Sequence, residues 1–208
     1  MKPSTQRKKE QAKQLKRLHI LDCAENIMTR EGLNGLSMDA LAKEAEIAKG
    51  TLYLYFKSKE DVIAKLSVRA RENLLKSFIQ ETSKFDDPLD QIRSILWSNF
   101  YFPAKNRLHS DLMSIYEVSR DLEEPEELLQ AGHQIQSFIL ALLERARTKG
   151  AIKPTTDIAT FSLTMWGTSV GITHLIDTRY PLIKEYTGHS QKEFFNHYVE
   201  LMIDGIKA

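Results

Sequence analysis

The sequence is poor in cysteine, glycine and proline. Its 208 residues include one cysteine, Cys23, with nine glycines and six prolines. A single thiol excludes an internal disulfide framework and a zinc site built from several cysteines, and it fits a reducing compartment. Few glycines and prolines beside many leucines, alanines, glutamates and lysines favour helices, and they exclude collagen-like and low-complexity chains.

The sequence also lacks a long hydrophobic run. The most apolar window, residues 161–176, contains threonines, two serines and a histidine, and it is bracketed by Asp157 and Asp177. A membrane-spanning helix needs about 20 apolar residues, so this window is too short and too polar. The start of the chain is charged, with no apolar segment before residue 18, which is not typical of a secretory signal. We therefore expect a soluble cytoplasmic protein that makes no membrane contact.

Sequence signatures of catalysis and metal binding are missing as well. The six histidines are scattered without a His-Glu-x-x-His pattern, and no Gly-x-Gly-x-x-Gly, phosphate-loop or Gly-x-Ser-x-Gly motif occurs. Cys23 lies between Ile20 and Ala24 on one face of a predicted helix, where a buried thiol is a poor nucleophile. We predict a protein that is not an enzyme and that has neither a metal site nor a cofactor.

Positive charge is concentrated at one end, although the net charge is only +1. Residues 1–20 carry seven basic side chains against one acidic side chain, Glu10, while residues 66–208 are slightly acidic. This asymmetry indicates either a contact with nucleic acid or another anionic surface, or a solvated leader. The alternative function is an all-helical protein-interaction adaptor with a basic leader. Residues 1–14, however, lack the large apolar side chains that a membrane-binding amphipathic leader needs.

Apolar residues recur at helical spacing along nearly the whole chain, and sustained period-2 alternation is absent. This pattern predicts an all-α protein of about nine helices. The expected helix caps are Ser37, Ser58, Asp87, Ser190 and either Thr155 or Thr156, the last capping a helix that ends near residue 177. The first helix is expected from about residue 16 to Gly32. We predict two domains, residues 1–65 and residues 66–208.

Residues 36–61 are the most informative segment. They predict two short helices separated by about four turn residues, and helices this short need packing from their neighbours. Such a pair presents its second helix outward, as a helix-turn-helix does. The side chains on and after this second helix are cations, hydroxyls and aromatic rings, which contact phosphates and base edges: Lys49, Thr51, Tyr53, Tyr55, Lys57 and Lys59. The pattern favours DNA binding, with a solvated cationic helix pair as the alternative.

The run Lys49-Gly-Thr-Leu-Tyr-Leu-Tyr-Phe56, followed by Lys57-Ser-Lys-Glu60, is the most specific motif, and Leu36-Ser-Met-Asp39 precedes it. With these residues the N-terminal third resembles the TetR/AcrR family of transcriptional regulators. The resemblance implies an N-terminal three-helix helix-turn-helix domain and a C-terminal helical domain for ligand binding and dimerisation. It implies that operator DNA is contacted by Ser37, Met38, Lys49, Gly50, Thr51, Tyr53, Tyr55, Lys57 and Lys59. Leu52 and Phe56 are expected in the core.

Two residues depart from the family pattern. Glu46 stands where the family commonly has glycine in the turn, and Ala48 stands where it often has a capping serine. A non-glycine residue there requires a different turn or mild left-handed backbone strain. Loss of the cap is expected to destabilise the second helix by about 1 kcal/mol. We predict the same fold with a slightly altered turn.

The C-terminal third contains small residues that let two helices approach closely. Gly167 and Gly171 lie among apolar side chains, which predicts an interface with a second copy, although packing within one subunit is the alternative. The predicted interface residues are Leu163, Gly167, Val170, Gly171, Phe195, Val199, Met202 and Ile206. The resemblance implies a four-helix bundle across a two-fold axis. Two DNA half-sites then require two helix-turn-helix domains, which we call the heads, about 34 Å apart or at a related spacing.

The resemblance also implies a cavity among the central helices for a small, largely apolar effector. The candidate lining residues are Trp97, Phe100, Met113, Tyr116, Glu117, His133, Phe138, Met165, Trp166 and His174, and core packing explains each of them singly. An effector that favours a wrong spacing of the heads weakens DNA binding by linkage. The predicted function is a ligand-released repressor, with activation left open.

Overall fold

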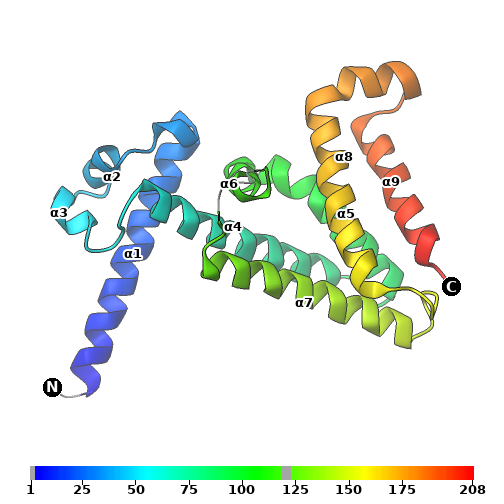
Figure 1. The fold of residues 1–208 in the computed structure, drawn as a ribbon, viewed down its shortest axis with the longest axis horizontal. Coiled ribbons are helices and arrows are strands. Elements are labelled where there is room, and N and C mark those ends of the chain that lie inside the picture. The colour runs from blue at the N-terminus through cyan, green and yellow to red at the C-terminus, as the bar shows by residue number, and fades with distance from the viewer. Residues whose placement is uncertain (1–2, 119–122) are drawn as a thin grey trace. The chain divides into compact units, whose positions relative to one another are not determined.

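A computed structural model describes residues 3–118 and 123–208 of the chain, and these residues form helices joined by short loops (Figure 1). Its helices are α1 (Pro3–Glu31), a short 3-10 helix (Leu33–Gly35), α2 (Met38–Glu44), α3 (Lys49–Leu52), α4 (Lys59–Thr82), α5 (Pro88–Lys105), α6 (Arg107–Val118), α7 (Glu126–Thr148), α8 (Ile158–Thr187) and α9 (Gln191–Ile206). Over the residues that the structure describes, the predicted all-α fold with about nine helices is confirmed.

Most of the predicted caps begin the helices as expected. The Ser37 hydroxyl accepts from the Ala40 amide at 3.1 Å, and the Asp87 carboxylate caps α5. At α9, Ser190 and Glu193 each accept from the other's backbone N–H, which forms a complete capping box. These short-range bonds satisfy amide groups that have no partner inside the helix.

The start of α8 differs from the prediction. Asp157, not Thr155 or Thr156, is the cap, and its carboxylate accepts from the Ala159 and Thr160 amides at 3.1 Å each. The helix also continues beyond the expected end near residue 177, to Thr187. It is interrupted by non-helical backbone angles at Arg179, because Pro181 two residues later lacks an amide hydrogen and crowds the preceding turn. The single predicted helix is therefore a kinked one.

The start of α1 also differs. The helix begins at Pro3, well before the expected residue 16. Residues 6–15 carry no apolar period that would mark a buried face, so periodicity did not predict this segment. Their lysines, glutamines and alanine nevertheless favour helices, and extending a helix that is already nucleated avoids the unfavourable nucleation step.

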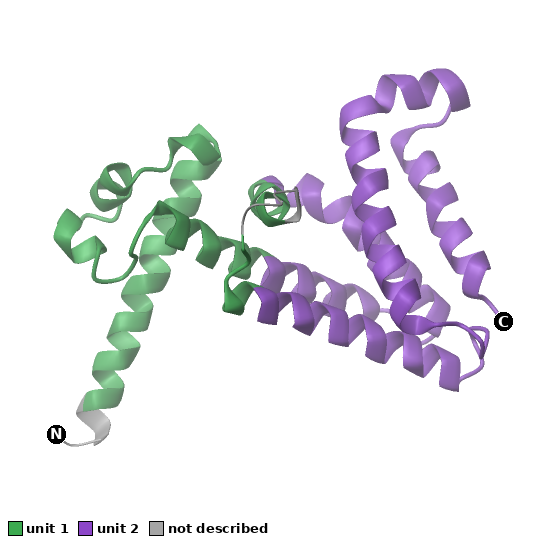
Figure 2. Ribbon diagram, viewed as in Figure 1, with its two compact units in different colours: residues 1–70, 108–128 green, residues 71–107, 129–208 purple. Residues whose placement is uncertain are grey.

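The chain forms two compact units (Figure 2). Unit 1 comprises residues 1–70 and 108–128, and unit 2 comprises residues 71–107 and 129–208. Helix α6 therefore belongs to the same compact unit as the N-terminal helices. A functional division near residue 65 remains a prediction.

The core of unit 1 fixes the short helices against α1. Ile20, Ala24 and Ile27 lie on one face of α1 and are fully buried, together with Leu41 of α2 and Leu52 of α3. Burying one such side chain stabilises a fold by roughly 1.5–3 kcal/mol. Helices of seven and four residues are stable here because this core holds them.

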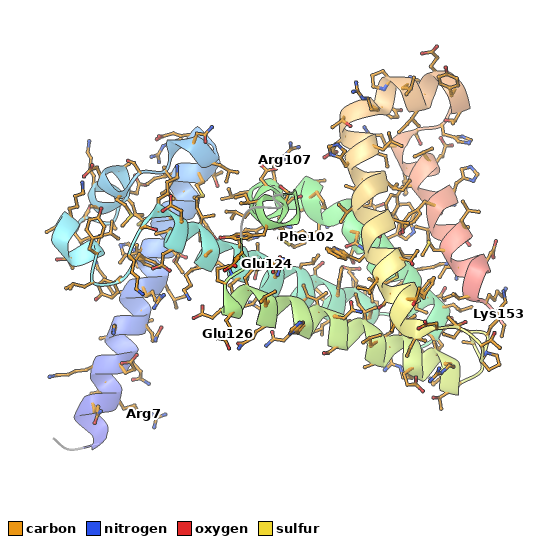
Figure 3. All side chains as sticks on the ribbon, viewed as in Figure 1. Arg7, Phe102, Arg107, Glu124, Glu126 and Lys153 are labelled. Carbon is orange, nitrogen blue, oxygen red and sulfur yellow. The ribbon has the colours of Figure 1, made fainter. Side chains whose placement is uncertain are left out.

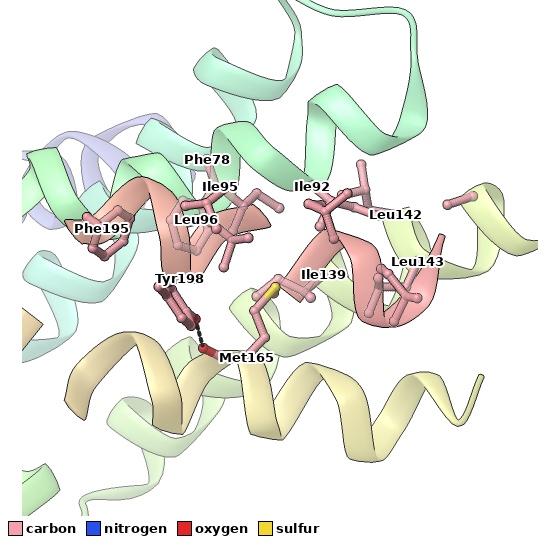
Figure 4. Close-up of a cluster of buried hydrophobic side chains, with 14 of the residues drawn as sticks. Phe78, Ile92, Ile95, Leu96, Ile139, Leu142, Leu143, Met165, Phe195 and Tyr198 are labelled. Carbon is pink, nitrogen blue, oxygen red and sulfur yellow. Dashed lines mark hydrogen bonds between the residues drawn. The ribbon is translucent and has the colours of Figure 1, made fainter. Parts of the chain in front are cut away.

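The core of unit 2 lies among α5, α7, α8 and α9 (Figure 4). Ile95, Leu143, Phe195 and Val199 are fully buried in it. The Phe195 ring lies 4.8 Å from the ring of Phe100, centroid to centroid. An aromatic and aliphatic interior of this kind gives the unit a rigid base for the outer face of α8.

Candidate nucleic-acid interface

The turn between α2 and α3 sets the direction of the second helix. The Ile47 amide donates to the Ala42 carbonyl at 3.0 Å, which closes the end of α2. Glu46 has a φ of 50°, the only positive φ at a non-glycine residue in the part of the chain that the structure describes. Of the two alternatives that the sequence left open, a different turn or a left-handed residue, the left-handed residue is therefore present. It places mild backbone strain on Glu46.

Helix α3 is short and has no side-chain cap. Ala48 has the extended backbone of an N-cap residue, with φ −63° and ψ 142°, but it offers no acceptor. The Tyr53 and Phe56 amides donate to the carbonyls of Lys49 and Leu52, so one turn of helix continues into a bonded loop. Helix α3 itself therefore ends at Leu52.

Two apolar side chains attach α3 and its loop to the core. Leu52 and Phe56 are both fully buried, as predicted. Residues between and around them face outward: Tyr53 is 46% exposed and Leu54 is 78% exposed. The segment is therefore anchored on one side, and its other side is available to a partner.

The predicted DNA-contact residues lie on or beside this outward side. Lys49, Gly50, Tyr53 and Lys57 are exposed, and Thr51, Tyr55 and Lys59 are half-buried. At the start of α2, Ser37 is exposed and Met38 is half-buried. The structure places all of them in unit 1, on α2, on α3 or in the α3–α4 loop with the first residue of α4. Predicted DNA contacts need to lie close together at the surface, and this arrangement allows that.

The position of Gly50 is informative. A Cβ atom built there meets nothing within 4 Å, so no packing within the chain requires glycine. Glycine inside a helix is destabilising by roughly 0.5–1 kcal/mol relative to alanine. The fold itself therefore does not require glycine here, and the open space leaves room for a close approach of this backbone to a partner.

Ionic contacts position the cations. The Lys49 ammonium lies 2.7 Å from the Asp39 carboxylate, which joins α3 to α2, and this hydrogen bond raises the pKa of Lys49. At the next helix, the Asp61 carboxylate accepts from the Lys57 amide at 2.9 Å, while the Asp61 amide donates to the Ser58 hydroxyl. The predicted cap at Ser58 is confirmed. The Asp39 contact favours the charged form of Lys49, while the Asp61 contact fixes only the backbone at Lys57.

A cluster that joins α1, α4 and α6 was not predicted. Glu25 accepts from Arg69 at 3.2 Å and lies 3.3 Å from the His109 ring nitrogen, and Arg69 also contacts Asp22. Burial alone raises the pKa of Glu25, but the His109 hydrogen bond and the Arg69 charge outweigh it, so the pKa lies below its usual value. The stability this carboxylate contributes is present above its usual pKa and is lost as pH falls through the lowered one. No sequence pattern signals the cluster, because its members are far apart in the chain.

The single thiol has no reactive environment. Cys23 is 6% exposed, and burial together with the charges of Glu44 and Asp22 raises its pKa. A raised pKa keeps the sulfur protonated and weakly nucleophilic. Across residues 3–118 and 123–208, no three His, Cys, Asp or Glu side chains gather as a potential metal site.

The candidate ligand-pocket residues are not brought together within either unit. Met113 and Tyr116 belong to unit 1 and the other candidates to unit 2, while the side chain of Glu117 lies outside the described residues. Within unit 2, Met165 is buried in the core, and Trp97, Phe100 and Phe138 are partly buried against it. Trp166, His133 and His174 are exposed instead, with Trp166 at 52%. These three point outward from α7 and α8, away from the core of unit 2, and His174 lines a hollow on α8, so their place in a ligand pocket stays a prediction.

The candidate dimer residues also separate into two groups. Leu163, Gly167, Val170 and Gly171 lie exposed on the outer side of α8. On α9, by contrast, Phe195, Val199 and Ile206 are buried in the core of unit 2, and Met202 is half-buried. Their apolar face packs on α5 and α8 of the same chain, which is the alternative that the sequence left open, and their place in a dimer interface stays a prediction. A shallow hollow of about 530 Å³ lies on α8, between Thr168 and Arg179, on the side that carries Gly171.

Membrane insertion has no structural support in the described ranges. None of the helices in residues 3–118 and 123–208 is both long enough and apolar enough to cross a bilayer.

Comparison with known proteins agrees with this geometry. Residues 20–66, which contain the α2–α3 pair, match the model of "Bacterial regulatory proteins, tetR family". The chain is 36% identical over 88 residues to an uncharacterized HTH-type transcriptional regulator of Haemophilus influenzae, covering 42% of this chain and 46% of that protein. It is 33% identical over 91 residues to the HTH-type transcriptional regulator AcrR of Shigella flexneri, covering 43% and 42%. The chain thus matches less than half the length of these two relatives.

The similarity in fold extends over more of the chain than the sequence matches do. The structure of the transcriptional regulator FadR from Bacillus subtilis in complex with stearoyl-CoA aligns with 91% of this chain and 98% of that chain, at a TM-score of 0.69 and 19% identity. At this identity the likeness concerns the fold alone. These comparisons do not favour the adaptor hypothesis.

Proposed function

We propose that this chain is a dimeric DNA-binding transcriptional regulator of the tetR family rather than an enzyme, because residues 20–66 match the model of that family of bacterial regulatory proteins. In this proposal α3 enters the major groove of an operator half-site, and a small, largely apolar effector releases the protein. We further propose that it acts as a repressor in the cytoplasm.

The main support for DNA binding is the outward side of α3. Leu52 and Phe56 hold the segment rigidly, while Lys49, Thr51 and Tyr53 present a cation, a hydroxyl and a phenol to solvent. These groups suit phosphate oxygens and base edges. The open space around Gly50 allows the backbone of α3 to approach the groove.

Two operator half-sites require two heads, and the outer side of α8 supports a second copy. Leu163, Trp166 and Val170 are 56%, 52% and 42% exposed, and they share one side of the helix with Gly167. Such a contiguous apolar face on a soluble chain is typical of an interface. Gly167 and Gly171 have open space at the Cβ position, so a partner helix can approach closely.

DNA binding is tested with duplex fragments from upstream of the chain's own gene, followed by fluorescence anisotropy. Tyr53→Ala and Lys59→Ala are each expected to weaken binding by about 1–3 kcal/mol, or roughly 5- to 150-fold, without unfolding the protein. Tyr186→Ala and Lys76→Ala, both exposed and distant in sequence from α3, are the matched controls and should bind as the wild type does. Undiminished binding by both α3-side variants would contradict the proposal.

Release is tested on the same complex. Stearoyl-CoA, the ligand in the FadR structure of similar fold, is the first effector to titrate. An effector that prefers the DNA-free conformation must bind more weakly when operator is present, by the same factor by which it weakens DNA binding. Calorimetry with and without operator measures that reciprocity.

A further inference from the structure

The first turns of α1 extend beyond the other helices of unit 1 (Figure 1). All side chains from residue 6 to residue 15 are exposed, and Arg7 marks this end in Figure 3. The helix is packed only from about Lys16 onward, where residues become half-buried and then buried. Some four turns of helix therefore have no packing role in the fold described here.

Three lysines lie on one side of this extension. At about 100° per residue, Lys9, Lys13 and Lys16 share a face, and we call them the lysine stripe. The same face continues into the head as Ile20 and Ile27, both buried. The face of α1 that is apolar within the core of unit 1 is therefore cationic in the N-terminal extension.

The opposite side has a different character. Arg7, Gln11, Leu15 and Leu18 line a shallow surface there. Glu10, the sole acidic residue among residues 1–20, accepts from Gln14 at 3.2 Å on that side. The stripe itself therefore has no carboxylate along its length.

The stripe ends beside the predicted DNA contacts. The Arg17 guanidinium, one residue after Lys16, lies 5.1 Å from the centroid of the Phe56 ring. Phe56 stands between Tyr55 and Lys57 in the α3–α4 loop. The extension thus enters the head at the loop that follows α3, with its lysines on the side of the helix that faces the head.

Helix stability does not explain these charges. The N-terminal end of a helix carries a partial positive charge and favours acidic residues. Helix α1 has no acidic residue in its first turn, and Arg7, Lys8 and Lys9 follow within the next turn. Cations repeated at this end are unfavourable for the isolated helix, which points to an external anion.

We propose that the lysine stripe binds the phosphate backbone of DNA next to the base pairs that α3 contacts, and that it does so without regard to sequence. The inference rests on the proposed function. From Lys9 to Lys16 the helix rises about 10 Å. Successive phosphates of one strand are about 3.4 Å apart along the duplex axis, so the stripe spans about three of them. Flexible lysine ammonium groups suit such unspecific contacts.

The test compares salt dependence in two triple variants of the full chain. Lys9→Gln, Lys13→Gln and Lys16→Gln together remove the stripe. The control, Arg7→Gln, Gln11→Glu and Gln14→Glu, makes the same change in net charge on the opposite side. Binding is measured on an upstream fragment and on a random-sequence duplex of equal length. Three lost phosphate contacts lower the slope of log K against log salt by about 2.7, so from about 50 to about 200 mM salt the wild type loses about 40-fold more affinity than the stripe variant.

The stripe variant should lose affinity for both duplexes by the same factor, and the control should keep the wild-type slope. Equal slopes in wild type and stripe variant, equal losses in both variants, or a loss confined to the upstream fragment would each overturn the inference. So would stripe-dependent binding to phosphatidylglycerol vesicles with an unchanged DNA slope, which would indicate a membrane contact. If the stripe acts on random duplex but no upstream fragment is preferred, the proposed function fails and the inference stands.

Discussion

The two units expose opposite kinds of surface on equally apolar interiors. In unit 1, the outward side of α3 presents Lys49, Thr51 and Tyr53, while in unit 2 the outer side of α8 presents Leu163 and Trp166. A polar and cationic face suits a hydrated polyanion, and its binding weakens as salt rises. An apolar face suits a second apolar face, with little dependence on salt. Raising the salt concentration should therefore weaken binding at the α3 surface and leave binding at the α8 surface nearly unchanged.

The largest expected effect is a loss of stability in unit 1 when a buried side chain beneath the polar face is removed. Phe56→Ala leaves a cavity under the α3–α4 loop and should destabilise the head by about 3–5 kcal/mol. Hydrogen exchange is expected to show lost protection in residues 20–66 with α8 and α9 unchanged. Leu54→Ala, in the same loop but 78% exposed, should change stability by less than about 0.5 kcal/mol. Equal loss of protection in both units would contradict the expectation that the effect of Phe56→Ala is confined to unit 1.

The next effect concerns the apolar face. Trp166→Glu or Val170→Glu introduces a charge that a paired interface must bury, and each should weaken dimerisation by about 2–4 kcal/mol, roughly 30- to 1000-fold. Sedimentation equilibrium measures this and should show that the wild-type dimer is insensitive to salt. Leu129→Glu on α7, where the leucine is 45% exposed, is the control and should remain dimeric. A monomeric wild type, or a control as disrupted as the variants, would count against this face.

The smallest effects lie in the α2–α3 turn. Glu46→Gly relieves a positive φ and Ala48→Ser supplies the missing cap, so each should raise the free energy of unfolding by about 1 kcal/mol. Urea denaturation followed by circular dichroism measures both. Ala48→Val, which adds no acceptor, is the control for the cap. A destabilised Ala48→Ser protein would show that α3 does not use a cap at this position.

Local signals predicted much of unit 1. Caps act over a few residues, so Ser37 and Ser58 marked helix starts from sequence alone, and the buried positions of Leu52 and Phe56 followed from the motif. At Glu46 the sequence left either a different turn or a left-handed residue open, and the structure has the left-handed residue. What remained out of reach was the Glu25 cluster, whose members meet only after folding.

Unit 2 was harder to predict because an apolar stripe does not say which partner it faces. Phe195 and Val199 on α9 resemble an interface in sequence, yet they fill the chain's own core, while Leu163 and Val170 on α8 stay exposed. Both helices are amphipathic or apolar enough to fit either role. Only the burial of individual side chains in the folded unit distinguishes the two helices.

The burial of Cys23 has a practical consequence for measuring motion between paired heads. Its protonated, enclosed sulfur reacts slowly with maleimide or methanethiosulfonate reagents, so the native thiol need not be removed before labelling. With Leu54→Cys, a nitroxide probe attaches at one open position in each copy. Pulsed electron resonance then reads the distance between the two probes directly, in free, effector-bound and operator-bound samples of otherwise unaltered protein.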